Sequence, residues 1–306
     1  MPADRRQLRA LALLVLVMLL WAGNSIVGRA VRDDVAPFTL AFVRWAGASL
    51  VLLPFAIGPL RRDWPAIRRG WKPILALGLL GIAAFNALLY SGLHYTTATN
   101  ALLLQAAIPP AVMLADRLFF GARAGRGQQL GVLASVLGVV VIVFEGDPGA
   151  ALRLHFGRGD GLVLAAVLAW ALYTVFLKLR PAISPVSFIA ATFAIGMLAM
   201  APLAAMEWQA GHTVVLTPNV AGAFLYVCLL PSLLSYFIYN HAAGVLGASR
   251  TGQAITLMPL FGALLSAGLL GEALHPFHFA GMALILAGIV VAALAGRPRE
   301  ALQDQP

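Results

Sequence analysis

The stretch LLQAAIPPAV, residues 103–112, places two adjacent prolines, Pro109 and Pro110, inside a long apolar run. Further along, LMPLFGALL, residues 257–265, places Pro259 in similar surroundings, 150 positions after Pro109. Proline in the interior of a helix costs roughly 3 kcal/mol, because it removes a hydrogen bond and clashes with the preceding turn. Because the same helix breaker occurs in two similar segments of the chain, we expect these prolines to have a role in the structure.

The composition indicates a protein that crosses the membrane several times. Of its 306 residues, 61% are hydrophobic and 11% are charged, whereas soluble domains carry about 25% charged residues. Whole stretches of 18 or more residues lack charge, which is typical of transmembrane helices. The net charge of +9 raises the question of nucleic acid, but no nucleic-acid-binding motif accompanies it. The expected partner is therefore the lipid bilayer and not nucleic acid.

Ten apolar runs of about 20 residues, joined by short connections, predict ten transmembrane helices. They fall near residues 9–29, 38–57, 73–92, 97–119, 127–145, 160–178, 186–206, 219–240, 246–270 and 276–295. If both termini are cytoplasmic, 16 of the 21 Lys and Arg residues fall in cytoplasmic segments or span ends, and four fall outside. This separation follows the positive-inside rule. The predicted fold class is all-α integral membrane, with ten helices and cytoplasmic N- and C-termini.

The two halves of the chain share a pattern of prolines and glycines that indicates an internal duplication. A shift of 150 positions superimposes four pairs of residues: Pro109 and Pro259, Gly121 and Gly271, Gly131 and Gly281, and Gly138 and Gly288. Trp21 recurs as Trp170 at a shift of 149. Each half holds five predicted spans, an odd number, so the second half enters the membrane from the opposite side. The predicted domains are two inverted five-helix modules, residues 1–145 and residues 146–306, the second ending in a short cytoplasmic tail.

Inverted repeats predict where the prolines act. Transporters of this kind place their site near the middle of the bilayer, beside helices that proline or glycine interrupts in both halves. We expect Pro109, Pro110 and Pro259 to break their helices and to serve as gates, because the freed backbone groups there can face a central cavity instead of lipid. The alternative is an ordinary proline kink, which is common in membrane helices.

Three segments resemble the EamA-type modules of the drug/metabolite transporter superfamily. They are LHYTTATNALLLQAAIPPAVMLADRLFFGA (93–122), QQLGVLASVLGVVVIV (128–143) and GASRTGQAITLMPLFGALLSAGLLGEALHPFHFAGMALILAGIVV (247–291). Within that superfamily, the chain looks closest to bacterial exporters of amino acids, particularly aromatic ones. The resemblance implies a ten-helix basket in the bacterial inner (plasma) membrane, with the fifth and tenth helices at its periphery. The glycines seven apart in these two helices fit that role, because small residues on one face allow close helix approach.

Polar and aromatic residues inside the predicted spans are the candidate substrate-binding residues. Polar groups at membrane depth are costly and usually face the interior of a helix bundle. A small polar substrate needs a few such groups in an otherwise apolar pocket. The candidates are Asn24, Asn86, Tyr90, Gln105, Trp170, Tyr173, Ser232, Tyr236, Tyr239 and Gln253. The alternatives are an interfacial belt for the aromatic residues and helix packing for the polar ones.

Arg44 lies six residues into the second span, deeper than any other basic residue. It either attracts an anionic group of the substrate or serves a structural role, by pairing with carbonyl groups at a helix end or by snorkelling. All Asp and Glu residues fall near span ends or in loops, so a membrane-centred proton relay is not expected. A facilitative transporter is therefore predicted, with Asp116 or His94 as substitutes if a proton is coupled.

Transport without a cofactor is the prediction, and two other functions are kept as alternatives. The chain has no Gly-x4-Gly-Lys-Ser/Thr loop for ATP and no third ligand to complete a metal site around His275 and His278. A proton-coupled multidrug or metabolite exporter would normally require an intramembrane carboxylate. A membrane-embedded enzyme would need a nucleophile–base pair or clustered acids, and only Asp33 and Asp34 come near. The protein is expected to act by alternating access, not as an enzyme, and its sequence is compatible with a monomer.

Overall fold

The structure is a computed structural model of the chain. It describes residues 2–31, 34–93, 95, 104–105, 107–144, 146–147, 149, 157–270 and 274–295. Across these ranges the elements are helices, with no strand. The first half holds α1 (Pro2–Ala30), α2 (Pro37–Arg69), α3 (Trp71–Leu77), η1 (Gly78–Ala84), α4 (Phe85–Leu93), α6 (Ile108–Phe120) and α7 (Arg126–Val143). The second half holds α8 (Arg158–Phe176), η3 (Leu177–Leu179), α9 (Pro185–Gln209), α10 (Pro218–Cys228), η4 (Leu229–Leu234), α11 (Ser235–Leu246), α12 (Ala248–Gln253), η5 (Ala254–Thr256), α13 (Leu257–Leu270) and α14 (Pro276–Ala295).

Among the described residues, six helical segments are long and apolar enough to cross a membrane. They are Arg5–Gly28, Pro37–Arg69, Trp71–Gly92, Arg158–Leu179, Pro185–Gln209 and Pro218–Leu246. Apolar helices that are shorter lie within α7 and α14. The chain is therefore an all-helical, multi-pass membrane protein.

Pro109, Pro110 and Pro259 lie where helices begin. The helix α6 starts at Ile108, so Pro109 and Pro110 occupy its first turn. The first N–H groups of a helix have no intrahelical acceptor, so proline loses no hydrogen bond there. Pro259 is the third residue of α13, directly after the 3-10 turn η5. In both halves the helical geometry changes just before the proline.

The two halves also share an irregularity that the sequence analysis did not predict. The segments η1 and η4 are π-helical, and they lie at matching places in the two halves. A wider π-turn disturbs the normal i to i−4 bonding and leaves carbonyl groups for other donors. The Gly81 carbonyl accepts a hydrogen bond from the Tyr236 hydroxyl at 2.9 Å. The Pro231 carbonyl, 150 positions later, accepts one from the Trp21 indole nitrogen at 2.8 Å.

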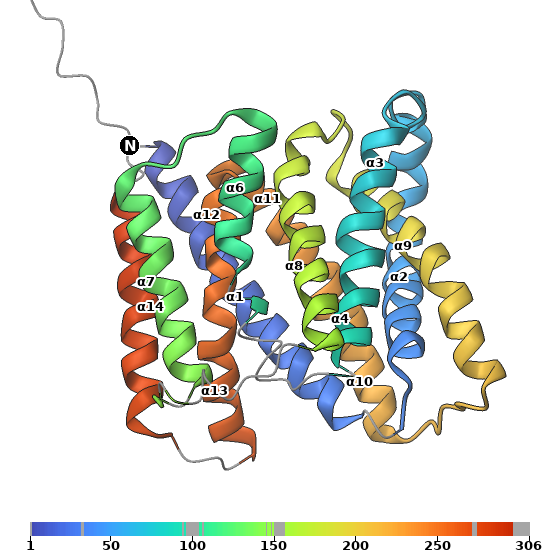
Figure 1. The fold of residues 1–306 in the computed structure, drawn as a ribbon. Coiled ribbons are helices and arrows are strands. Elements are labelled where there is room, and N and C mark those ends of the chain that lie inside the picture. Colours follow the sequence, from blue (N-terminus) through green and yellow to red (C-terminus); the bar gives the residue numbers. More distant parts are fainter. Residues whose placement is uncertain are drawn as a thin grey trace, which may run out of the picture.

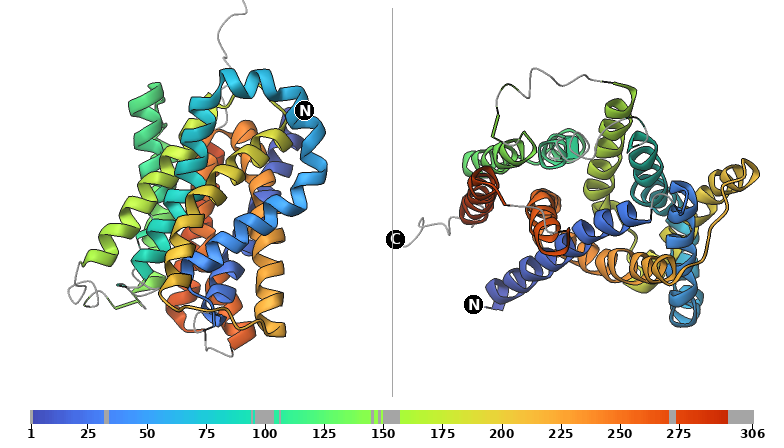
Figure 2. Two further views of the ribbon diagram at one scale, coloured as in Figure 1. Left: turned by 90° about the vertical axis from the view of Figure 1, so that its right-hand side faces the viewer. Right: turned by 90° about the horizontal axis from the view of Figure 1, so that it is seen from below.

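The contacts between helices of the two halves occur in matching sets. The helix α1 packs against α11 and α13, and its counterpart α8 packs against α4 and α6. Figure 1 places α7 and α14 side by side at one edge of the molecule, and α2 and α9 near the other. Seen from below in Figure 2, α1 slants across the bundle between these two edges.

The helices α7 and α14 meet through small residues, as the spacing of their glycines predicts. A Cβ atom added at Gly131 would lie 2.5 Å from the carbonyl oxygen of Gly288, and one at Gly138 would lie 2.6 Å from that of Gly281. These pairings show that the two helices run antiparallel with their backbones in direct contact. The Ser135 hydroxyl donates to the Ile285 carbonyl at 3.3 Å in the middle of this contact. We call this contact between α7 and α14, at Gly131, Gly138, Gly281 and Gly288, the glycine seam.

The helices α2 and α9 are joined at both ends by a carboxylate of one helix that binds backbone N–H groups at the start of the other. The Glu207 side chain, near the end of α9, accepts hydrogen bonds from the backbone N–H groups of Phe38 at 2.9 Å and Thr39 at 2.7 Å. It also accepts one from the Thr39 hydroxyl at 2.8 Å. A carboxylate at a helix N-terminus satisfies unpaired donors and complements the helix dipole.

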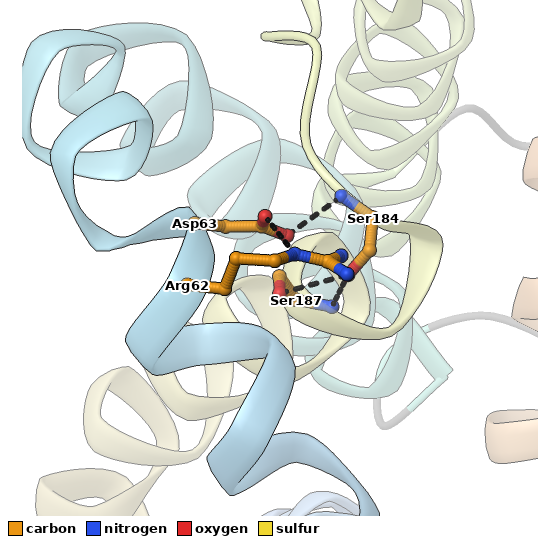
Figure 3. Close-up of polar contacts among 4 residues, drawn as sticks. All are labelled: Arg62, Asp63, Ser184 and Ser187. Atoms are coloured by element: carbon orange, nitrogen blue, oxygen red, sulfur yellow. Dashed lines mark hydrogen bonds and ion pairs between the residues drawn. The ribbon is translucent and has the colours of Figure 1, made fainter.

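The opposite end of this pair carries the reciprocal contact, which Figure 3 shows. The Asp63 carboxylate, near the end of α2, accepts a hydrogen bond from the backbone N–H of Ser184 at 2.8 Å, directly before α9. Arg62 pairs with the other oxygen of Asp63 at 3.2 Å. The Ser184 hydroxyl in turn accepts the backbone N–H of Ser187 at 3.1 Å and caps α9. Each helix therefore carries a carboxylate that accepts a backbone hydrogen bond at the start of the other helix, and we call these two contacts the reciprocal caps.

Candidate substrate-binding site

Three contacts join residues that occupy equivalent positions in the two halves. The joined pairs are Trp21 with Trp170, Trp45 with Phe193, and Ser135 with Ile285. Their sequence offsets are 149, 148 and 150 positions. When a two-fold axis relates two units, equivalent residues can touch each other only near that axis. The three contacts therefore indicate an approximate two-fold axis that passes between the halves.

Five buried aromatic side chains gather where the equivalent tryptophans meet. They are Trp21, Trp170, Tyr173, Tyr236 and Tyr239, and we call them the aromatic cluster. The Trp170 ring lies 5.2 Å from Trp21, 5.2 Å from Tyr173 and 5.4 Å from Tyr239, measured between ring centroids. Tilted and edge-on arrangements at these distances are the favourable ones for aromatic pairs. Both halves contribute to the cluster, through α1, α8 and α11.

The polar atoms of the cluster are held by hydrogen bonds. The Tyr239 hydroxyl lies 2.9 Å from the Thr174 hydroxyl and accepts a bond from the Trp170 indole nitrogen at 3.3 Å. The Tyr173 hydroxyl donates to the Asn240 side-chain oxygen at 2.6 Å. These contacts fix the orientation of the rings. The cluster is buried, with its rings packed against one another, and it combines apolar faces with hydroxyl dipoles, the kinds of group that line pockets for small ligands.

Arg44 is buried beside the π-helical segment η4, with 5% of its surface exposed. Its Nε donates to the Ser232 hydroxyl at 2.5 Å, and its Nη2 donates to the Pro231 carbonyl at 3.2 Å. Its guanidinium carbon lies 4.5 Å from the centre of the Trp45 ring. The Ser232 hydroxyl donates onward to the Val227 carbonyl at 2.7 Å. These contacts favour the structural alternative for Arg44, in which it pairs with helix carbonyl groups.

The structure brings together four of the predicted binding residues, Trp170, Tyr173, Tyr236 and Tyr239, in the aromatic cluster. Ser232 instead contacts Arg44.

The predicted polar residues outside the cluster lie elsewhere in the bundle. The Asn86 amide donates to the Ile82 carbonyl of the preceding turn at 2.8 Å. The Gln253 amide donates to the Gly288 carbonyl at 3.3 Å, beside the glycine seam. Asn24, Tyr90 and Gln105 are half-buried.

The predicted gate residues differ in burial. Pro109 and Pro259 are buried, whereas Pro110 is exposed.

Two residues of the site were missed by the sequence analysis. Trp21 was noted only as the repeat partner of Trp170, although a tryptophan repeated at that offset is the signal that could have found it. Asn240 is 4% exposed and binds the Tyr173 hydroxyl. It is four positions from Tyr236 and so follows the same helical stripe as the predicted residues.

The acidic candidate for proton coupling has a basic partner. Asp116, near the end of α6, is 7% exposed and forms an ion pair with Lys178 of η3. The Lys178 ammonium also lies 4.9 Å from the centre of the Phe120 ring. His94 lies outside the described residues. Among the residues that are described, His, Cys, Asp and Glu side chains do not group in threes as a metal site requires.

Both halves of the sequence match the same family of transporters. The model of the EamA-like transporter family matches residues 8–144 and residues 157–294, one match in each half. The chain belongs to the EamA-like transporter family. This EamA-like protein is therefore a membrane transporter, and both the family and its relatives point to transport rather than catalysis.

Three relatives extend over nearly the whole EamA-like chain. A protein of Archaeoglobus fulgidus named "Uncharacterized transporter" is 30% identical over 90% of this chain and 94% of its own. A protein of Pseudomonas aeruginosa, "Uncharacterized protein PA1977", is 32% identical over 92% of this chain and 94% of its own. A protein of Salmonella typhimurium named "Probable amino-acid metabolite efflux pump" is 25% identical over 94% of this chain and 95% of its own.

A solved crystal structure shares the fold. Its chain is 20% identical to this EamA-like protein and superimposes with a TM-score of 0.72, covering 96% of this chain and 99% of that chain. At this identity the likeness speaks for the arrangement of the helices alone.

Proposed function

We propose that the protein exports amino acids, chiefly aromatic and neutral ones, and related metabolites across the bacterial inner membrane. The observation that carries this proposal is the aromatic cluster, which lies where the two halves meet and joins flat apolar faces to hydroxyl groups. Aromatic rings pack favourably on such faces. The relative named as an amino-acid metabolite efflux pump supports the same substrate class.

The proposed topology has ten membrane spans in two inverted modules, residues 1–145 and residues 146–306, with both termini in the cytoplasm. The distribution of Lys and Arg supports this orientation. The antiparallel glycine seam and the reciprocal caps of α2 and α9 support an inverted relation between the modules. Each of these contacts joins one half to the other within a single chain, so a monomer suffices for the proposed transport.

The proposed substrate-binding residues are those of the aromatic cluster together with polar residues that would line the path through the bundle. The second group is Asn24, Asn86, Tyr90, Gln105, Ser232 and Gln253. For Arg44 we propose a structural role, because it holds the π-helical segment η4 through Ser232 and the Pro231 carbonyl.

The proposed mechanism is alternating access without proton coupling. Pro109, Pro110 and Pro259 lie at the starts of α6 and α13, where each span changes geometry, so these sites can act as hinges of the gates. The buried charged side chains among the described residues are Arg44, Asp116 and Asp160. None of the three belongs to the aromatic cluster, and Asp116 is paired with Lys178. Neither a cofactor nor a catalytic group is part of this proposal.

The test is uptake of radiolabelled phenylalanine, tyrosine and leucine into proteoliposomes of the purified protein, with and without an imposed pH gradient. We expect uptake that follows the amino-acid gradient and is unchanged by the pH gradient. Protein-free liposomes and proteoliposomes of an unrelated membrane protein are the controls. Uptake driven by the proton gradient would contradict the facilitative mechanism and direct attention to the Asp116–Lys178 pair. Absence of uptake for every amino acid would contradict the proposed substrate class.

A further inference from the structure

A cavity of about 200 Å³ lies beside the start of α1, the start of α9 and the middle of α11. Its lining includes Arg6, Arg180, Phe188, Phe237, Asn240 and His241. In the proposed topology, this end of the molecule faces the cytoplasm, where an exporter receives its substrate. The cavity is smaller than the roughly 300–1,000 Å³ of sites for drug-sized ligands. It is therefore suited to one small molecule or to the polar head of one.

Two guanidinium groups from different elements line this cavity. Arg6 belongs to α1, whereas Arg180 lies between η3 and α9. Neither forms an ion pair with any residue that the structure describes. The Arg180 guanidinium carbon lies 5.4 Å from the centre of the Phe188 ring, which holds the side chain beside the cavity. Guanidinium groups recognise carboxylates through paired, charge-assisted hydrogen bonds, so the lining favours an anionic ligand.

Asn240 lines the same cavity and carries an unpaired polar group. Its side chain is 4% exposed, and its oxygen accepts the hydrogen bond of the Tyr173 hydroxyl at 2.6 Å. Its Nδ2 is buried and has no hydrogen-bond partner within the described part of the chain. Buried polar groups are nearly always paired in folded proteins, so an unpaired donor on a residue that lines a cavity points to a ligand as its partner. Through Tyr173, Asn240 also connects the cavity to the aromatic cluster.

We propose that this cavity is the cytoplasmic entry site of the transporter and that it binds the carboxylate of the substrate. Arg6 and Arg180 pair with the carboxylate, and the Asn240 amide offers a further donor at the inner wall. The site therefore selects small molecules that carry a carboxylate next to an apolar body. This inference rests on the proposed export function, because that function sets the side of the membrane and the direction of entry.

Binding is measured on the full-length protein in phosphatidylcholine nanodiscs, by the rise in melting temperature and by titration. The probes are 3-phenylpropionate, its neutral amide 3-phenylpropanamide, and inorganic phosphate. We expect 3-phenylpropionate to bind about tenfold more tightly than the amide, because only the carboxylate gains the charge-assisted bonds. Arg6→Gln and Arg180→Gln are each expected to weaken binding of 3-phenylpropionate about tenfold and to leave binding of the amide unchanged.

Arg5→Gln is the matched control, since it removes the same charge one residue away from the cavity lining. It is expected to bind 3-phenylpropionate like the original chain. Asn240→Asp keeps an acceptor for the Tyr173 hydroxyl while adding a negative charge, so it is expected to fold and to lose carboxylate binding. Equal effects of Arg5→Gln and Arg6→Gln would overturn the proposal, because they would reduce the preference to general surface charge.

Phosphate-bearing ligands are the other source of a suitable anion. Nanodiscs with phosphatidylglycerol test a lipid headgroup, and inorganic phosphate tests a free anion. Stabilisation by either one that depends on Arg6 and Arg180, without stabilisation by 3-phenylpropionate, would overturn the carboxylate assignment. Carboxylate binding at this site without amino-acid uptake in proteoliposomes would support the inference and contradict the export proposal. Amino-acid uptake that is unaffected in Arg6→Gln and Arg180→Gln would support the export proposal and contradict the inference.

Discussion

The glycine seam and the aromatic cluster lie at the same approximate two-fold axis, yet they are built in opposite ways. In the seam, backbone meets backbone, and a single added Cβ at Gly131 would lie 2.5 Å from the Gly288 carbonyl oxygen. In the cluster, large rings from α1, α8 and α11 meet with centroids 5.2 Å or more apart and are oriented by their own hydrogen bonds.

This difference separates a contact that must stay fixed from one that can change. Backbones in direct contact leave no side chain to rearrange, so α7 and α14 cannot shift without losing the contact entirely. Rings held by hydroxyl bonds can exchange those bonds for bonds to a ligand. The seam is therefore suited to holding the modules together, and the cluster to binding and release.

The largest effect is expected from filling the seam. Gly131→Leu places a side chain against the Gly288 carbonyl and Ala292 of α14, and overpacking of this kind costs about 3 kcal/mol. The melting temperature and the monodisperse yield in detergent should both fall. Gly262→Leu in α13 is the control, because a Cβ there meets nothing within 4 Å. An unchanged melting temperature for Gly131→Leu would show that the seam does not hold the modules together.

An intermediate effect, confined to transport, is expected in the cluster. Tyr239→Phe keeps the ring but removes the partner of the Thr174 hydroxyl and the Trp170 indole nitrogen. We expect amino-acid uptake to fall about tenfold, with a loss of about 1 kcal/mol in stability. Tyr226→Phe is the matched control, because its hydroxyl donates to the Leu20 carbonyl at 2.9 Å outside the cluster. Equal uptake by the two variants would show that the Tyr239 hydroxyl contributes no more to transport than a hydroxyl outside the cluster.

The smallest effect is expected from the hydrogen bond of the Ser135 hydroxyl in the seam. Ser135→Ala removes the bond from the hydroxyl to the Ile285 carbonyl while leaving the backbone contact intact. The expected loss in stability is below about 1 kcal/mol, with uptake unchanged. A large loss, measured as the shift in melting temperature, would mean that hydrogen bonding rather than close backbone packing stabilises this contact.

Much of the helical framework could be predicted from the sequence, because apolar length and repeated small residues act locally. The glycines at positions 131, 138, 281 and 288 were expected to allow close approach of helices, and they form the seam. The π-helical segments were not foreseen, since the proline in LLPSLL and the glycines in GLLGIAA can indicate an irregular helix but not its type. Their formation depends on tertiary partners for the Gly81 and Pro231 carbonyls.

The candidate site could be predicted only in part, because residue types inside apolar spans can be read from the sequence but contacts between helices cannot. Tyr236 and Tyr239 were both candidates from the sequence, and the structure places each of them against Trp21 of a distant helix. Which polar residue turns toward which neighbour depends on packing between helices. The spacing could not indicate that Asn86 bonds its own helix or that Ser232 holds Arg44.

The reciprocal caps of α2 and α9 set a constraint on motion. Glu207 anchors the beginning of α2, and Asp63 anchors the beginning of α9, so the two helices are tied at both ends. Neither can slide along the other without breaking a carboxylate contact at one end. We therefore expect the pair to act as a single strut of fixed length, so that in the proposed alternating-access cycle the remaining helices supply the movement that exposes the substrate to one side of the membrane and then to the other.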